Sequence, residues 1–156
     1  MAEHVWSVLC EKLLREDETG VISLVSVLER INLHEDLVEL ERQLEGASGF
    51  IHPMRLVVWC VRSDYDQPES FTIRLSWHLP TGDILTFNKE HQLSLETATG
   101  VRPQILLPGV PWRGPGLYWL VIEIKNEGQE WTTATRLPLE VVVLAPPVPS
   151  TEEAAT

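Results

Sequence analysis

The chain has 156 residues, of which 44% are hydrophobic, and a formal net charge of −11. That length and composition predict one globular domain, which can bury a core without disulfide staples. The acidic balance argues against DNA or an anionic membrane as a partner, because phosphate groups are bound by clustered basic residues. The arginines that come nearest to such a cluster, Arg102, Arg113 and Arg136, are far apart in the sequence.

Two cysteines and the first residues bear on the cellular compartment. Cys10 and Cys60 lie in apolar segments outside any CxxC motif, so we expect two buried free thiols. The opening "MAEHVWSVLCEKLL" carries acidic residues and no basic stretch before its apolar run, which is not typical of a secretory signal. No apolar run approaches the ~18 residues of a membrane span. These features predict a cytoplasmic protein without membrane attachment.

The first segment, residues 4–14, fits two interpretations. Its apolar residues follow a helical stripe, and they also fit the alternation of a strand. The polar turn "REDETG" comes next, and residues 21–31 are rich in β-branched side chains, which predicts a strand buried on both faces. If residues 4–14 form a strand, the two segments make a hairpin.

A short amphipathic helix is predicted near residues 35–45. Its leucines recur at helical spacing, acidic residues lead it and Gly46 ends it. The helix either covers an open end of the sheet or docks a partner. In the second case its acidic side chains are the candidate contacts, namely Glu39, Glu41 and Glu45.

The remaining segments predict strands joined by turns. In "FTIRLSWHL", residues 71–79, apolar and polar residues alternate. This pattern predicts a strand with one apolar face and one solvent-facing side, here called the wet face, which carries Thr72, Arg74, Ser76 and His78. The turn "PTGD" returns this strand as a second hairpin that ends near residue 95, although the alternation weakens in "ILTFNKEHQ". Further strands are expected at 54–63, at 117–128 and within 130–144.

This pattern gives about eight strands with turn signals between them. It predicts an all-β fold, an antiparallel two-sheet sandwich of the immunoglobulin-like or C2-like kind. Residues 1–145 are expected to form the single domain. The Pro-rich and acidic residues 146–156 are expected to be a disordered tail. Most of the six tryptophans are expected to anchor the core.

Motifs of catalysis are missing from the sequence. It has no Gly-rich phosphate loop and no GxSxG elbow, and its five histidines form no HxH or HxxxH pair. The sequence therefore predicts that the chain is not an enzyme and needs no cofactor. The alternative is a site that the fold alone assembles from Asp64, Asp66, His78 and His91.

Two loops carry candidate binding residues. "SDYDQPE" gathers Asp64, Asp66 and Glu69, whose oxygens suit calcium in a C2-like domain, or which simply form a solvated acidic turn. "PGVPWRGPGLYW" holds Trp112 beside Arg113, either as a binding anchor or as a plug that closes one end of the sandwich. Trp131, near a hairpin turn, presents the same two alternatives.

Several segments together resemble an uncharacterised bacterial family of small β-sandwich domains of unknown function. They are "WSVLCEKLLREDETGVISLVSVLERI", "HPMRLVVWCVR", "FTIRLSWHLPTGDIL", "GPGLYWLVIEI" and "LPLEVVV". The resemblance spans about residues 5–144 and implies a hairpin at the N-terminus rather than a helix. It implies no catalytic residues, and the acidic segment near 35–45 departs from the family pattern.

These observations favour a protein-interaction or accessory module that binds another protein or a second copy through an edge strand. A small-ligand or carbohydrate-binding sandwich is the alternative, with Trp112, Trp131 or Trp77 as a stacking platform. The alternation of its strand buries Trp77, which counts against that platform. A calcium-binding domain and an enzyme remain further alternatives.

Overall fold

The computed structural model describes residues 1–33, 39, 49–63, 69–96 and 99–144. Across these residues the chain forms thirteen strands, and Glu39 is the one residue among them with helical backbone. The predicted all-β fold is confirmed. The expected count of about eight strands is wrong, because bulges and prolines divide several of the predicted strands into short pieces.

The first large sheet has the order β10-β5-β1-β2, and β9 also pairs with β5. All its pairs are antiparallel. Its strands are β1 (Ala2–Arg15), β2 (Ile22–Val27), β5 (Met54–Arg62), β9 (Gly100–Val101) and β10 (Gln104–Leu107).

The second large sheet has the order β3-β13-β12-β6-β7, and β8 also pairs with β6. It is antiparallel except for the β3–β13 pair. Its strands are β3 (Arg30–Leu33), β6 (Glu69–His78), β7 (Ile84–Thr86), β8 (His91–Leu95), β12 (Gly116–Asn126) and β13 (Thr132–Val143). A small third sheet pairs β4 (Phe50–Ile51) with β11 (Val110–Pro111).

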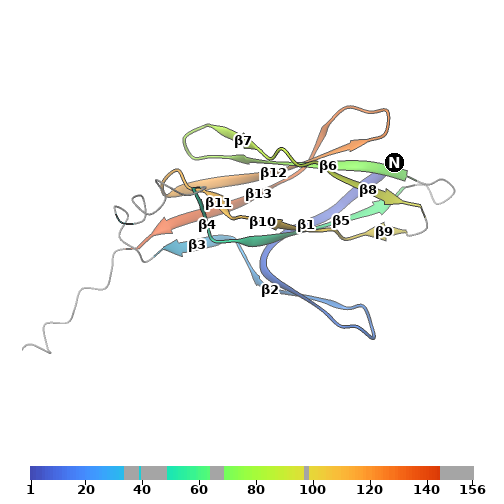
Figure 1. The fold of residues 1–156 in the computed structure, drawn as a ribbon, viewed down its shortest axis with the longest axis horizontal. Coiled ribbons are helices and arrows are strands. Elements are labelled where there is room, and N and C mark those ends of the chain that lie inside the picture. The colour runs from blue at the N-terminus through green and yellow to red at the C-terminus, as the bar shows by residue number, and fades with distance from the viewer. Residues whose placement is uncertain (34–38, 40–48, 64–68, 97–98, 145–156) are drawn as a thin grey trace, which may run out of the picture.

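The two large sheets lie as two layers, with the core between them (Figure 1). Along β6 the predicted apolar face is buried. Its Trp77 packs edge-on against Tyr118 of β12, with ring centroids 6.4 Å apart. The expectation that most of the six tryptophans anchor the core is wrong. Trp77 and Trp112 are buried, whereas the other four are half-buried, namely Trp6, Trp59, Trp119 and Trp131.

The N-terminal hairpin that the family resemblance implies is present, so the helical interpretation of residues 4–14 is wrong. The first part of β1 pairs with β5, from Ala2 opposite Arg62 to Cys10 opposite Arg55. The end of β1 pairs with β2 instead, up to Arg15 opposite Ile22. One long strand therefore serves the body of the sheet and the hairpin.

Both cysteines are buried and unpaired, as expected. Burial raises the pKa of the Cys60 thiol to about 11, which keeps it protonated. No helix among the described residues has the length and apolarity to cross a membrane. The predicted helix near 35–45, apart from Glu39, and the predicted tail at 146–156 lie outside the described residues.

Candidate functional site

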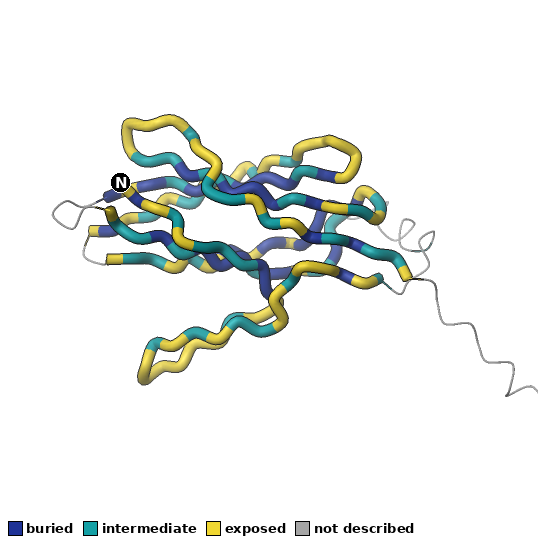
Figure 2. The backbone as a smooth tube through the Cα atoms, turned by 180° about the vertical axis from the view of Figure 1, so that it is seen from behind, coloured by how far each residue is buried: buried dark blue, intermediate teal, exposed yellow. Residues whose placement is uncertain are grey.

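The first candidate surface is the outer part of the N-terminal hairpin, residues 11–27, which we call the arm. It projects away from both layers, and none of its residues is buried (Figure 2). Ser26, near its base, has a left-handed backbone with φ of 55°, which is uncommon for a residue other than glycine. The arm leaves the body close to this residue.

The arm carries apolar side chains on both faces. Leu13 lies opposite Leu24 on one face, and Lys12 lies opposite Val25 on the other. Leu14 and Val21 are each 58% exposed and Val27 is 55% exposed. The prediction that residues 21–31 form a strand buried on both faces is therefore wrong for β2, because none of the residues that the structure describes forms a second layer against it.

The second candidate surface is the outer face of the second sheet, which includes the wet face of β6. The Arg74 guanidinium donates to Glu123 through Nε at 2.9 Å and through Nη2 at 3.0 Å. It also lies 4.2 Å from the Trp131 ring centroid, so the predicted stacking residue already holds a cation on one face. The hydrogen bond that Glu123 accepts raises the pKa of Arg74. Arg136 lies over Trp119 in the same way, at 4.7 Å.

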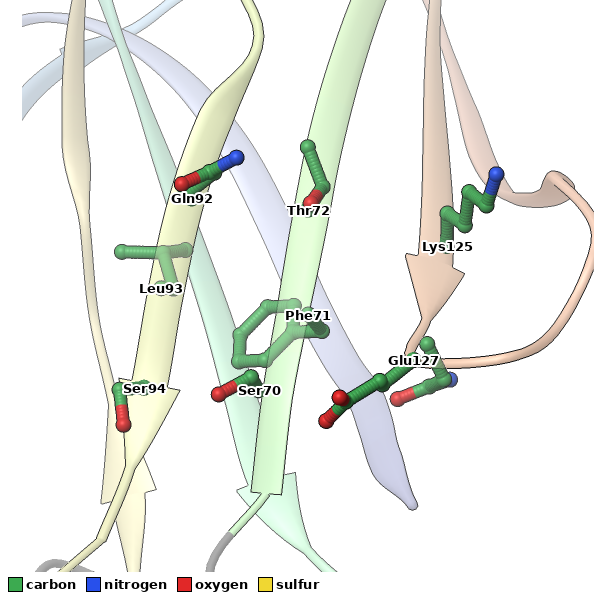
Figure 3. Close-up of a pocket in the computed structure, with 9 residues that line it drawn as sticks. Ser70, Phe71, Thr72, Gln92, Leu93, Ser94, Lys125 and Glu127 are labelled. Carbon is green, nitrogen blue, oxygen red and sulfur yellow. The ribbon is translucent and has the colours of Figure 1, made fainter.

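A polar groove of about 390 Å³ continues this outer face (Figure 3). Thr72 pairs with Gln92 on one side and with Lys125 on the other, and Ser70 pairs with Ser94. Gln92, Thr72 and Lys125 thus form one row across three strands, and Ser70 and Ser94 form a shorter row beside it. This arrangement offers hydrogen bonds to a polar ligand, but its lining residues include no tryptophan that could serve as a stacking platform.

The third candidate is a cavity of about 490 Å³ between the two sheets, which we call the edge cavity. It opens where β10 of one sheet faces residues 87–90 of the other. Its apolar lining comes from both sheets, and its polar rim includes Lys89, His91 and Gln104. Burial and the nearby Lys89 lower the pKa of His91, so this ring is neutral at neutral pH.

The histidines of the assembled-site alternative do not meet. His78 pairs with Ile84, and His91 pairs with Ile73 further along β6. Among the described residues, no group of three or more His, Cys, Asp or Glu side chains could hold a metal ion. Asp64 and Asp66 lie outside the described residues.

Glu69, the third calcium candidate, is a buried side chain on β6. Its Oε1 lies against the N-terminal ammonium of Met1, and the Ser63 hydroxyl lies 3.4 Å away. A buried carboxylate that neutralises a cation is not presented to solvent calcium. Of the acidic helix candidates, Glu39 is half-buried, while Glu41 and Glu45 lie outside the described residues.

Trp112 is placed as the plug alternative describes. It is 6% exposed and belongs to the core, and its backbone N–H donates to the Gly49 carbonyl at 2.6 Å. The turn after it is closed by Tyr118, whose hydroxyl donates to the Gly114 carbonyl at 2.7 Å and accepts from the Arg113 N–H at 2.9 Å. Trp112 therefore offers no surface platform. Arg113 is exposed beside it.

No family model and no curated protein matches the chain, which is consistent with the resemblance to an uncharacterised family. Among solved structures, the alkylpurine DNA glycosylase AlkC of Pseudomonas fluorescens, bound to DNA containing an abasic site analogue, is 14% identical with a TM-score of 0.42. That match covers 87% of this chain and 30% of the glycosylase. A family 123 glycoside hydrolase from Clostridium perfringens is 16% identical with a TM-score of 0.38, over 93% of this chain and 28% of the hydrolase.

Both of these similar proteins are enzymes, and the chain spans less than a third of the length of either. This finding contradicts the sequence-based prediction that the chain is not an enzyme, and that prediction is withdrawn. Likeness at these TM-scores assigns no activity to the chain.

Proposed function

We propose that this chain is a protein-interaction domain that binds its partner through the arm. The observation that carries the proposal is the exposure of apolar side chains on both faces of a projecting two-stranded hairpin. Such a hairpin is marginally stable in water when it stands alone. A partner that covers it would bury these side chains and stabilise its backbone ladder.

The partner that we propose is a second copy of the chain, paired along the free edge of β2. No strand among the described residues pairs with that edge, so its backbone N–H and C=O groups can be satisfied by another strand. In an antiparallel pairing of β2 with its own copy, centred between Leu24 and Val25, the acidic tips at 16–18 lie at opposite ends. The negative charges are then kept apart while the apolar side chains meet.

Sedimentation velocity of the full chain over a range of concentrations tests this proposal. We expect reversible self-association that the double variant Leu14→Ser, Val27→Ser abolishes. The control Ile84→Ser removes an apolar side chain that is 61% exposed at the β7 edge, and it should leave association unchanged. A wild type that stays monomeric, or dissociation caused equally by the control, would contradict pairing through the arm.

Hydrogen exchange provides a second test on the monomer. Because the arm has no buried residue, its amides should exchange far faster than those of β6 and β12 in the monomer, and should be protected in the dimer. Slow exchange of arm amides in the monomer would show that the hairpin is stable without a partner. The interaction proposal would then be wrong.

We also propose that the two layers form a sandwich of the immunoglobulin-like kind. The Tyr118 hydroxyl near the start of β12 bonds the backbone of Gly114 and Arg113, as the tyrosine corner of such domains does. The calcium-binding C2-like alternative depends on the loop at 64–68, which lies outside the described residues, and has less support. The two free buried thiols support a reducing, cytoplasmic compartment as part of this proposal.

A further inference from the structure

The edge cavity exists because the return strand after β6 is interrupted. β7 pairs with β6 through Ser76 opposite Thr86, and β8 resumes with Ile73 opposite His91. Four residues of the return strand, 87–90, therefore lie opposite two residues of β6. This bulge leaves the ladder, and its Phe87 packs against the core while its N–H donates to the Leu75 carbonyl at 3.0 Å.

The inner wall of the cavity is apolar. Leu75 of β6 and Ile105 and Leu107 of β10 are buried, and the half-buried rings of Phe50 and Phe87 add to the lining. The wall therefore combines side chains from both sheets and from the bulge. A volume of about 490 Å³ lies within the range of small-molecule sites in proteins, about 300–1,000 Å³.

The rim of the cavity carries the positive charge of Lys89 in a chain whose formal net charge is −11. Lys89 is exposed and His91 is half-buried, and neither side chain makes a hydrogen bond or ion pair with another described residue. Glu90 lies between them in the sequence, and its charge attracts Arg74 of the outer face and raises the pKa of that guanidinium. Two nitrogen-bearing side chains thus remain available beside an apolar wall.

We propose that the edge cavity binds a small amphiphile that has an aliphatic body and an anionic head such as a carboxylate. The body lies against Leu75, Phe87 and Ile105, where it gains the free energy of apolar burial. The head lies at the rim, where Lys89 donates a charge-assisted hydrogen bond. His91 supplies a second donor through its ring N–H.

Amide NMR of the isotope-labelled full chain, titrated with decanoate below its micelle concentration, tests this proposal. We expect saturable shifts at 87–91 and 104–107. Decanol and decylammonium have the same aliphatic body without the negative charge. The affinity for each should be lower than that for decanoate by a factor of about ten or more, because a hydrogen bond to a charged group contributes roughly that factor.

Two lysine variants locate the head group. Lys89→Gln should remove most of the preference for decanoate over decanol. The control Lys125→Gln, in the polar groove of the outer face, should keep it. The proposal is overturned by the absence of saturable shifts, by equal affinity for the three probes, by shifts that gather on the arm, or by equal loss in both variants.

Discussion

The strands β2 and β6 are both rich in apolar residues, yet the structure treats them in opposite ways. β6 places Ile73, Leu75 and Trp77 between two layers, where each is at most 1% exposed. β2 carries apolar residues on both faces and buries none of them. The difference arises because β6 pairs on both sides within a covered sheet, whereas β2 pairs on one side in a hairpin that leaves the body. Apolar composition thus indicates a surface that needs covering, and only the tertiary structure decides whether the same chain covers it.

The largest expected effect comes from a substitution in β6, the buried strand of the two. Trp77→Ala should lower the free energy of unfolding by about 3–5 kcal/mol, because it removes a fully buried aromatic side chain and leaves a cavity beside Tyr118. Urea denaturation followed by circular dichroism measures the change. A loss under about 1 kcal/mol would show that the core around β6 repacks freely, and the contrast between the two strands would fail.

A moderate effect is expected from shortening the arm. Replacing residues 13–24 with Asn-Gly joins Lys12 to Val25, which already lie opposite each other, through a favoured hairpin turn. Because the removed residues are not buried, the unfolding free energy of the monomer should change by less than about 1 kcal/mol. Self-association should be lost.

The same denaturation experiment checks the shortened variant, with sedimentation as the second measurement. If the variant unfolds as readily as Trp77→Ala, the arm belongs to the cooperative core. The distinction between body and arm would then be wrong.

The smallest effect concerns pH. Burial lowers the pKa values of His4 and His91 from the usual 6.5, so the unfolded chain binds more protons than the folded one just below that value. Stability should therefore be complete above about pH 7 and should fall as the pH drops through 6.5 towards the lowered folded values. Thermal unfolding measures this fall, and the arm-shortened variant should show the same fall because both histidines lie in the body. His91→Gln should reduce it, and an increase in stability on acidification would contradict the assignment.

The strands themselves could largely be predicted from the sequence. The alternation in residues 71–79 places Trp77 inside and Arg74 outside, as observed, because period-two patterns report on the faces of a strand. The strand count could not be predicted, because bulges such as 87–90 depend on how neighbouring strands align. The weakened alternation in "ILTFNKEHQ" was the available signal for that bulge.

The candidate surfaces were harder to predict than the strands. A tryptophan in a Pro/Gly loop looks like Trp112 whether it binds a ligand or plugs a core, since the sequence does not show what lies opposite. The edge cavity combines residues from β10, β6 and the bulge, which only the stacking of two sheets brings together. The arm was visible as an apolar run, but its lack of a covering layer was not.

The continuity of β1 has a mechanical consequence. Its first part pairs with β5 at eight positions, and its end forms one of the two strands of the arm. β1 turns sharply where it leaves the body, so a load that a bound partner applies along the arm reaches the β1–β5 ladder at an angle to its strands (Figures 1 and 2). Hydrogen bonds that run across a strand share a lengthwise pull, whereas a sideways pull breaks them one after another. The direction from which the partner pulls would set how much tension the domain can bear.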